Sequence, residues 1–235
     1  IGAAQLAASG ALRAGAGMVV VSSPTINLQS NDMPPEAVQR KITAATLVPE
    51  VLKDLDRFAA LLIGPGLGTD PETVAMTAEL IERSPIPTVV DADGLTAVAT
   101  HPTCVIRSAS TTVLTPHDGE FEKLTGSPPA LDRCAAVRSA AKNSAVLLKG
   151  PTTLVSDTNG DLIFVRNANQ RLATAGTGDV LTGIIGAVIR NTPIHLAAAA
   201  AAHWHGQAAQ LAQPDMTASD LPLLLQSARS EMLTK

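Results

Sequence analysis

The sequence is poor in aromatic residues, with three Phe, one Trp and no Tyr among 235 residues. Proteins that bind single-stranded nucleic acid stack the bases on aromatic side chains, and that mode of binding is not available here. A formal net charge of −4, with no cluster of Lys and Arg, also removes the electrostatic basis for binding nucleic-acid phosphates. We therefore expect no nucleic-acid partner.

Long apolar runs, a signal-peptide pattern and a cysteine framework are absent as well. The longest apolar runs, such as residues 180–189, are far shorter than the ~20 residues of a membrane-spanning helix. Cys104 and Cys134 do not have the spacing of metal ligands. These absences predict a reduced, cytoplasmic protein without membrane contact. Because the first residue already belongs to a helix-like stretch, we expect the N-terminal edge of the domain to be truncated.

The chain is rich in Ala, Val, Leu and Ile, and 46% of its residues are hydrophobic. Such a chain can bury a substantial core, and we predict one domain, residues 1–235. Helix-like stretches alternate with short apolar runs, which predicts a three-layer α/β/α fold with a mostly parallel sheet. The predicted helices are residues 2–14, 71–83, 119–124, 131–143, 179–190, 195–212 and 219–233. The predicted strands are residues 18–21, 59–63, 88–90, 112–114, 145–149, 152–155 and 162–165, the last two as an antiparallel hairpin. We expect residues 91–94 to form a turn and residues 22–48 to be an irregular surface or subunit-contact segment.

Residues 172–183 carry the clearest chemical signal. Gly176, Thr177 and Gly178 form a tight turn before an apolar helix, which places unpaired backbone N–H groups at the positive end of a helix dipole. This arrangement predicts an anion site. Asp179 makes sense there if a hydroxyl attacks a bound phosphate, because its carboxylate could take the hydroxyl proton. The alternative is that Asp179 is an ordinary acid in the first turn of a capped helix.

Two groups follow predicted strands, at the edge where open α/β sheets bind their ligands. The three glycines of residues 64–68 indicate either a close approach to a ligand or a plain tight turn. Asp91 and Asp93 could act as hydrogen-bond acceptors, as a water-mediated Mg²⁺ contact, or only in an Asx-turn. Of the two, we favour Asp93 as a residue of the site.

Two further groups occupy equivalent positions after later strands. Pro116 fixes the turn that aims His117, and Glu120 follows one helical turn later; His117 is either structural or part of a site. Lys149 follows the next strand, with Thr152 and Thr153 downstream. This group places a cation and hydroxyl donors where nucleotide phosphates or a ribose could lie.

Several familiar motifs do not fit the chain. It has no Gly-Lys dipeptide and therefore no Walker loop, and Leu181 breaks the dinucleotide pattern G-x-G-x-x-G. His203 and His205 are two residues apart on a predicted helix and do not share a face, so we do not expect them to form a metal pair. No H-E-x-x-H, zinc or G-x-S-x-G pattern is present.

Taken in order, seven segments resemble the ADP-dependent NAD(P)H-hydrate dehydratases, the YjeF C-terminal-type domain of the ribokinase-like superfamily. The segments are GAGMVVVSSP, LLIGPGLGTD, PTVVDADGL, LTPHDGEFEKLTG, VLLKGPTTLV, LATAGTGDVLTGIIGA and HGQAA followed by ASDL. Small vitamin kinases of the superfamily usually have Asn where this chain has His117. That residue separates the two groups, and the resemblance covers nearly the whole chain.

The resemblance implies repair of NADH or NADPH hydrated at C6 of the nicotinamide ring, with ADP as phosphoryl donor and AMP and phosphate as products. Asp179 would activate the C6 hydroxyl, and the amides of Gly176, Thr177 and Gly178 would stabilise the transferring phosphoryl group. Mg²⁺ would bridge the phosphates, near Glu120, without assigned protein ligands. The AMP moiety would be lined by Lys149, Gly150, Pro151, Thr152, Thr153 and Gly178. The hydrated cofactor would face Ala3, Gly66, His117 and Asp179, to which we add Asp93 from its place at a strand end.

The resemblance also implies a homo-oligomer, often a tetramer, and possible fusion to an N-terminal epimerase domain. Two alternatives stay open at the level of sequence. The first is a vitamin-type kinase of the same fold, against which His117 argues. The second is a non-catalytic nucleotide-binding protein, against which the carboxylate of Asp179 argues.

Overall fold

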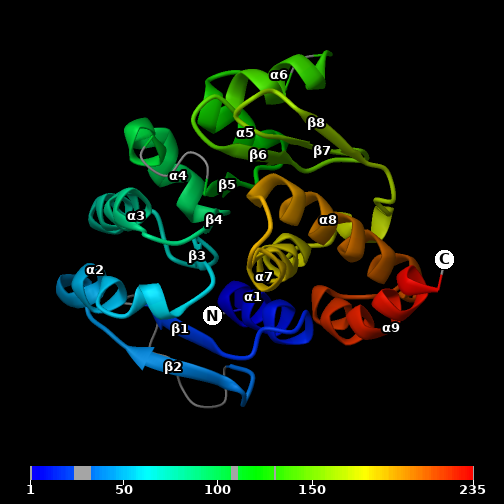
Figure 1. Ribbon diagram of the computed structural model, residues 1–235, viewed down its shortest axis with the longest axis horizontal. Helices are drawn as coiled ribbons and strands as arrows, with labels where there is room; N and C mark the ends of the chain where they lie inside the picture. The colour runs from blue at the N-terminus through cyan, green and yellow to red at the C-terminus, as the bar shows by residue number, and fades with distance from the viewer. Residues whose placement is uncertain (1, 24–32, 107–110, 130, 235) are drawn as a thin grey trace.

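The computed structural model describes residues 2–23, 33–106, 111–129 and 131–234 (Figure 1). Its main sheet has six strands in the order β3-β4-β5-β6-β7-β8. The pairs from β3 to β6 are parallel, and β7 is antiparallel to both of its neighbours. These strands are β3 (Leu61–Ile63), β4 (Thr88–Val90), β5 (Thr112–Leu114), β6 (Ala145–Leu148), β7 (Thr153–Ser156) and β8 (Leu162–Val165). The expected hairpin of the last two strands is confirmed.

A second, two-stranded sheet pairs β1 (Val19–Ser23) with β2 (Ala37–Lys41) in parallel. The α-helices are α1 (Gly2–Arg13), α2 (Ala44–Leu52), α3 (Pro71–Arg83), α4 (Asp93–Thr100), α5 (Asp118–Thr125), α6 (Arg133–Ala140), α7 (Thr177–Val188), α8 (Ile194–Leu211) and α9 (Leu221–Leu233). No helix among the described residues is long and apolar enough to cross a membrane.

Helices cover both faces of the main sheet, as the sequence predicts (Figure 1). Consecutive side chains of a strand point to opposite faces. Val89 packs in one core with Ile184 of α7, and Val90 packs in the other with Ile81 of α3. All four side chains are buried. The hydrophobic runs of the strands thus form two separate cores, one on each side of the sheet.

Helix α1 lies directly on α7, and glycine makes this contact possible. A methyl group at position 183 of α7 would lie 2.1 Å from the carbonyl oxygen of Ala7, and one at position 10 of α1 would lie 2.5 Å from that of Val180. The two backbones therefore approach more closely than any side chain would allow. This packing fixes the first turns of α1 relative to α7.

Two predictions of local structure are wrong. Residues 91–94 were expected to form a turn, but α4 begins at Asp93, because the apolar residues of 95–98 bury one face of a helix. The change of direction falls on Ala92 alone, which has a positive φ of 47°. The segment 22–48, expected to be irregular, contains β2 and the start of α2. Residues 24–32 of that segment lie outside the described residues.

Candidate active site

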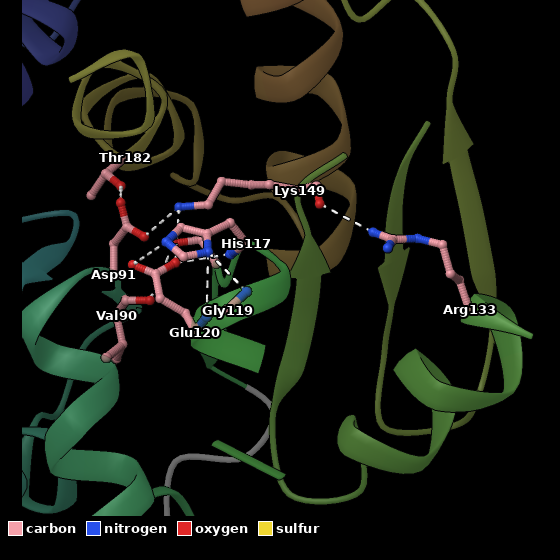
Figure 2. Close-up of polar contacts among 9 residues, drawn as sticks. Val90, Asp91, His117, Gly119, Glu120, Arg133, Lys149 and Thr182 are labelled. Atoms are coloured by element: carbon pink, nitrogen blue, oxygen red, sulfur yellow. Dashed lines mark hydrogen bonds and ion pairs between the residues drawn. The ribbon is translucent and has the colours of Figure 1, made fainter. Parts of the chain in front are cut away.

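The carboxyl ends of β4, β5 and β6 bring a cluster of charged side chains together (Figure 2). Lys149 Nζ lies 2.9 Å from Asp91 Oδ1 and 3.5 Å from Glu120 Oε2. The other carboxylate oxygen of Asp91 accepts a hydrogen bond of 2.8 Å from the Thr182 hydroxyl of α7. The side chain of Asp91 is 2% exposed, so its charge is held by these two partners rather than by water.

The charge of Lys149 is stabilised by its acidic neighbours. Burial opposes the charged form, but the carboxylates of Asp91 and Glu120 outweigh it, and the pKa of Lys149 is raised. Lys149 is therefore an ammonium at neutral pH. Its nitrogen lies beside the first turn of α7, since a methyl group at Gly178 would be 3.3 Å from it.

Asp179, in the first turn of α7, has a pKa that is shifted against its charged form. Burial, followed by the charge of Asp91, raises the pKa of Asp179 to about 6, against the effect of Lys149. A carboxylate with such a pKa exchanges a proton near neutral pH. That property suits a general base.

The turn before α7 presents backbone N–H groups to this cluster. Gly176 caps the helix with a left-handed φ of 90°. The Thr177 N–H donates to the Thr174 carbonyl, and the first helical hydrogen bond runs from Val180 N–H to the Gly176 carbonyl. The N–H groups of Gly178 and Asp179 precede that bond and have no partner within the helix. Amides so placed at a helix N-terminus could bind an anion.

The side chain of Thr177 points into the protein. Its buried hydroxyl lies 2.7 Å from the Leu172 carbonyl oxygen and 2.9 Å from that of Thr174. The Thr177 hydroxyl therefore stabilises the turn through these two carbonyl groups.

His117 and Glu120 form a capping box at the start of α5. His117 Nδ1 accepts hydrogen bonds from the N–H groups of Gly119 and Glu120, and Glu120 Oε2 accepts one of 2.8 Å from the His117 N–H. The imidazole is 61% exposed, and its Nε2 lies 3.5 Å from Glu120 Oε1. The sequence contained this signal as the spacing H-x-x-E before a helix.

The glycine-rich residues 64–68 fold back over the end of β4. Gly64 has a φ of 125°, and a methyl group there would lie 1.8 Å from the Asp91 carbonyl oxygen. Asp93 Oδ2 accepts a hydrogen bond of 2.9 Å from the Gly68 N–H and closes the loop. The structure thus gives Asp93, the favoured acid of the pair, a partner in the loop and places Asp91 at the centre of the cluster.

Ala3 and Gly66, both predicted to face the substrate, lie close together. A methyl group at Gly66 would be 3.5 Å from Ala3 Cβ, so the start of α1 and the glycine-rich loop share one rim. A cavity of about 440 Å³ opens beside this rim and is lined by β1, β3 and α1, including Ala4 and Gly66. Asp179, His117 and Lys149 do not line it.

Residues 149–153 run across the other side of the cluster, and Arg133 supports them. Arg133 Nη2 donates a hydrogen bond of 3.2 Å to the Lys149 carbonyl (Figure 2). Its Nη1 pairs with Asp118 at 2.8 Å. Thr153 is buried in β7. Pro151 is exposed, while Gly150 and Thr152 are partly buried. The predicted nucleotide segment therefore begins inside the cluster and continues away from it.

Reasoning from the sequence missed Arg133, Thr182 and the central place of Asp91. Thr182 lies one turn after Gly178 on the same helix, so its spacing in residues 172–183 was a usable signal. Arg133 had no local signal, because its partner is 16 residues away in sequence. Within the described ranges no group of three His, Cys, Asp or Glu side chains could hold a metal ion.

The fold places the chain in a known structural class. A ribokinase-like superfamily protein from Enterococcus faecalis V583 shares the fold, with a TM-score of 0.78 over 97% of this chain and 83% of its own, at 23% identity. The layered sheet is that of a ribokinase-like α/β fold.

The family follows from the sequence itself. The family described as NAD(P)H-hydrate dehydratase matches residues 1–230, and this chain belongs to it. The bifunctional NAD(P)H-hydrate repair enzyme Nnr of Moorella thermoacetica is 36% identical over 258 residues, covering 99% of this chain and 48% of that protein. The chain therefore spans about half the length of this relative.

The chain also matches a solved structure that was crystallised with a nucleotide. The ADP/ATP-dependent NAD(P)H-hydrate dehydratase of Bacillus subtilis, co-crystallised with ATP and Mg²⁺ and soaked with CoA, has a TM-score of 0.77 at 27% identity. The match covers 98% of this chain and 87% of that chain. The family resemblance predicted from the seven segments is thus confirmed.

Proposed function

We propose that this chain dehydrates the S form of hydrated NADH or NADPH at the expense of ADP, giving NAD(P)H, AMP and phosphate. The observation that carries the proposal is the place of Asp179, in the first turn of the glycine-capped helix beside Lys149. A protein that only bound nucleotide would gain nothing from a carboxylate facing phosphate oxygens. A base with a pKa of about 6 at this place suits the removal of a hydroxyl proton.

In the first step, the oxygen of the C6 hydroxyl attacks the β-phosphorus of ADP. The bond from that phosphorus to the bridging oxygen breaks, AMP leaves, and the hydroxyl proton passes to Asp179. The N–H groups of Gly178 and Asp179 stabilise the charge of the transferring group, together with Lys149. Gly176 and Thr177 shape the turn that aims these amides.

In the second step, the phosphorylated intermediate eliminates phosphate. The C6–O bond breaks with its electron pair leaving on phosphate, and a proton leaves the neighbouring ring carbon as the ring double bond re-forms. Mg²⁺ bound to the nucleotide phosphates would neutralise their charge during transfer. Glu120 fits poorly as its direct ligand, because Oε2 already accepts from the His117 N–H.

The remaining site residues divide between the two ligands. Lys149, Gly150, Pro151, Thr152 and Thr153, with Gly178, would line the AMP moiety. Ala3, Gly66 and His117 would face the hydrated cofactor. The shared rim of Ala3 and Gly66 and the exposure of the His117 imidazole support this division.

The test is the absorbance at 340 nm of the protein mixed with chemically prepared hydrated NADH, Mg²⁺ and ADP. Parallel samples contain ATP or no nucleotide, and Asp179→Ala is the inactive control. We expect an ADP-dependent rise that the variant loses. A flat trace with intact nucleotide binding would contradict the proposal and return attention to a kinase that phosphorylates small alcohols.

The domain and its assembly are part of the same proposal. We infer that residues 1–235 act as one dehydratase domain of a homo-oligomer, to which an epimerase domain is joined in longer proteins. The Moorella relative is a bifunctional repair enzyme, which supports fusion to a second domain. Sedimentation of the purified chain would test whether it forms a homo-oligomer.

A further inference from the structure

Thr182 is a polar residue on the buried face of α7. It is fully buried, and its neighbours Val180, Leu181 and Ile184 belong to the hydrophobic core. Threonine is less favourable than leucine within a helix, and a buried hydroxyl without a partner costs free energy. Here the hydroxyl has a partner, because it donates a hydrogen bond of 2.8 Å to Asp91 Oδ2 (Figure 2). The two proposed reaction steps do not use this contact.

The hydrogen bond from Thr182 sets the orientation of the Asp91 carboxylate. The backbone of Asp91 is already fixed, since its N–H donates to the Ile63 carbonyl at 3.1 Å and its carbonyl accepts from the Gly94 N–H at 2.9 Å. A carboxylate can still turn about its last bond, which has only broad preferences. With Oδ2 held by the Thr182 hydroxyl, Oδ1 stays directed at Lys149 Nζ, 2.9 Å away.

The ammonium of Lys149 has three N–H bonds, and the acids use two of them. Nζ lies 2.9 Å from Asp91 Oδ1 and 3.5 Å from Glu120 Oε2. Within the described ranges no third side chain forms an ion pair with this nitrogen. Nζ also lies beside the first turn of α7, since a methyl group at Gly178 would be 3.3 Å from it. The third N–H is therefore available to a ligand bound at this turn.

We propose that Thr182 is a positioning residue for phosphoryl transfer: its hydroxyl fixes the Asp91 carboxylate, which in turn aims the Lys149 ammonium at the transferring group. The inference rests on the proposed dehydratase reaction for its effect on rate. Thr182 lies three residues after Asp179 on α7, so one helix holds the base directly and the cation through Asp91. A displacement of about 1 Å in such an arrangement can reduce the rate about 100-fold.

The experiment separates the hydroxyl of Thr182 from its bulk. Thr182→Val removes the hydroxyl and keeps the shape of the side chain, while Thr182→Ser keeps the hydroxyl. Thr182→Ala is a second variant without the hydroxyl, for the case that the Val protein does not fold. Thr77→Val is the matched control, because Thr77 is a buried threonine on another helix, α3. The measurements are kcat and KM for hydrated NADH with ADP, and the melting temperature, which shows that each variant is folded.

Thr182→Val and Thr182→Ala should lose kcat by roughly 10- to 100-fold, and KM should change by less than about threefold, because the cation acts in the transition state. Thr182→Ser should stay within about threefold of the wild type, and Thr77→Val should behave as the wild type. Equal losses in the Ser and Val variants would overturn the proposal.

A double-mutant cycle tests whether Thr182 acts through Lys149. Lys149→Met removes the ammonium, so adding Thr182→Val to it should change kcat by less than about twofold. If the two losses of kcat multiply instead, Thr182 acts by another route and the proposal is wrong.

The ¹H–¹⁵N signal of the Lys149 ammonium, in protein with ¹⁵N-labelled lysine, tests the contact without turnover. Hydrogen bonding to Asp91 protects the ammonium protons from exchange with water. The signal should be sharp in the wild type and in Thr182→Ser, and broadened or shifted in Thr182→Val. A signal that Thr182→Val leaves unchanged would overturn the positioning role even in an active dehydratase. A wild type without dehydratase activity would refute the proposed function whatever the signal shows, so the two proposals can fail separately.

Discussion

Two glycine-rich segments, residues 64–68 and 176–178, look alike in the sequence and differ in the structure. In the first, the Gly68 N–H donates to Asp93 and a methyl group at Gly64 would collide with the Asp91 carbonyl. In the second, the N–H of Gly178 has no partner in the helix and lies beside Lys149. Glycine therefore serves backbone packing in one segment, while in the other it leaves a backbone N–H without a partner in the helix. The direction of the amides separates the two roles.

The largest effect on activity is expected from Asp179→Asn. The amide keeps the shape of the side chain but cannot take the hydroxyl proton, so kcat should fall by about 10²- to 10⁴-fold. Nucleotide affinity should be equal or higher, because a charge facing the phosphates is removed. Absorbance at 340 nm and calorimetry measure the two quantities. Activity within tenfold of the wild type would exclude Asp179 as the base.

Replacing one glycine of each segment by alanine tests whether the two glycines have different roles. Gly64→Ala places a methyl group 1.8 Å from a backbone oxygen at a φ of 125°, and should cost about 3 kcal/mol or more of unfolding free energy. Gly178→Ala meets the ends of two side chains, Lys149 at 3.3 Å and Asp91 at 3.8 Å, and should change stability by less than about 1 kcal/mol.

Activity should rank the two variants in the opposite order. After correction for the fraction of folded protein, Gly178→Ala should be the less active one. In Gly178→Ala, kcat/KM should fall by about 10- to 100-fold, because the methyl group crowds the transferring phosphoryl group. Urea denaturation and steady-state kinetics on both variants test the comparison. Equal stability of the two proteins would contradict the packing role of Gly64.

The raised pKa of Asp179 predicts an effect of pH on stability. The group ordinarily titrates at 3.8 and at about 6 in the folded protein, so ionisation costs stability above pH 6 and costs nothing below about pH 4. Asp179→Asn should therefore be the more stable protein at pH 8, by about 1 kcal/mol after solvent screening, and equal at pH 3.5. Urea midpoints at the two pH values measure the difference, and a constant difference would refute the assignment.

The same titration should appear in the rate. Because the base must be ionised, kcat/KM of the wild type should rise with pH through about 6 and level off above it. A profile that falls over this range would mean that another group is the base.

The smallest effect on activity is expected from Asp93→Ala. The substitution leaves the Gly68 N–H without its acceptor, so unfolding free energy should drop by about 1–2 kcal/mol. We expect kcat/KM to change by less than about threefold, because the carboxylate is engaged with the loop. Asp93→Asn, which retains an acceptor oxygen, is the matched control. A larger loss of activity in a stable Asp93→Ala protein would show that Asp93 contacts the substrate.

The layered fold was predictable because its signals are local. Apolar runs of strand length, such as Thr88–Val90, are buried on both faces and give the parallel sheet its pattern. Helix α4 was missed because Asp91-Ala-Asp-Gly94 has turn composition, and the helix is decided by burial of Leu95 and Val98 against other elements. Tertiary packing overrode local propensity there.

The site was predictable where motif and helix coincide, as at Gly178 and Asp179. Asp91 and Asp93 could not be separated from the sequence, because both follow the same strand and only one residue lies between them. Their partners, Lys149 and Gly68, are 58 and 25 residues away. The supporting Arg133 was invisible for the same reason: it acts on a backbone carbonyl, and a carbonyl leaves no trace in residue types.

The cluster around Lys149 has a thermodynamic consequence. One ammonium there faces the carboxyl groups of Asp91, Glu120 and Asp179, and a nucleotide would add further negative charge. Binding of the polyanion should therefore raise the proton affinity of Asp179 further, so that nucleotide and proton are taken up together. The binding heat would then depend on the ionisation enthalpy of the buffer. Mg²⁺ carried on the phosphates would offset part of this effect by neutralising their charge.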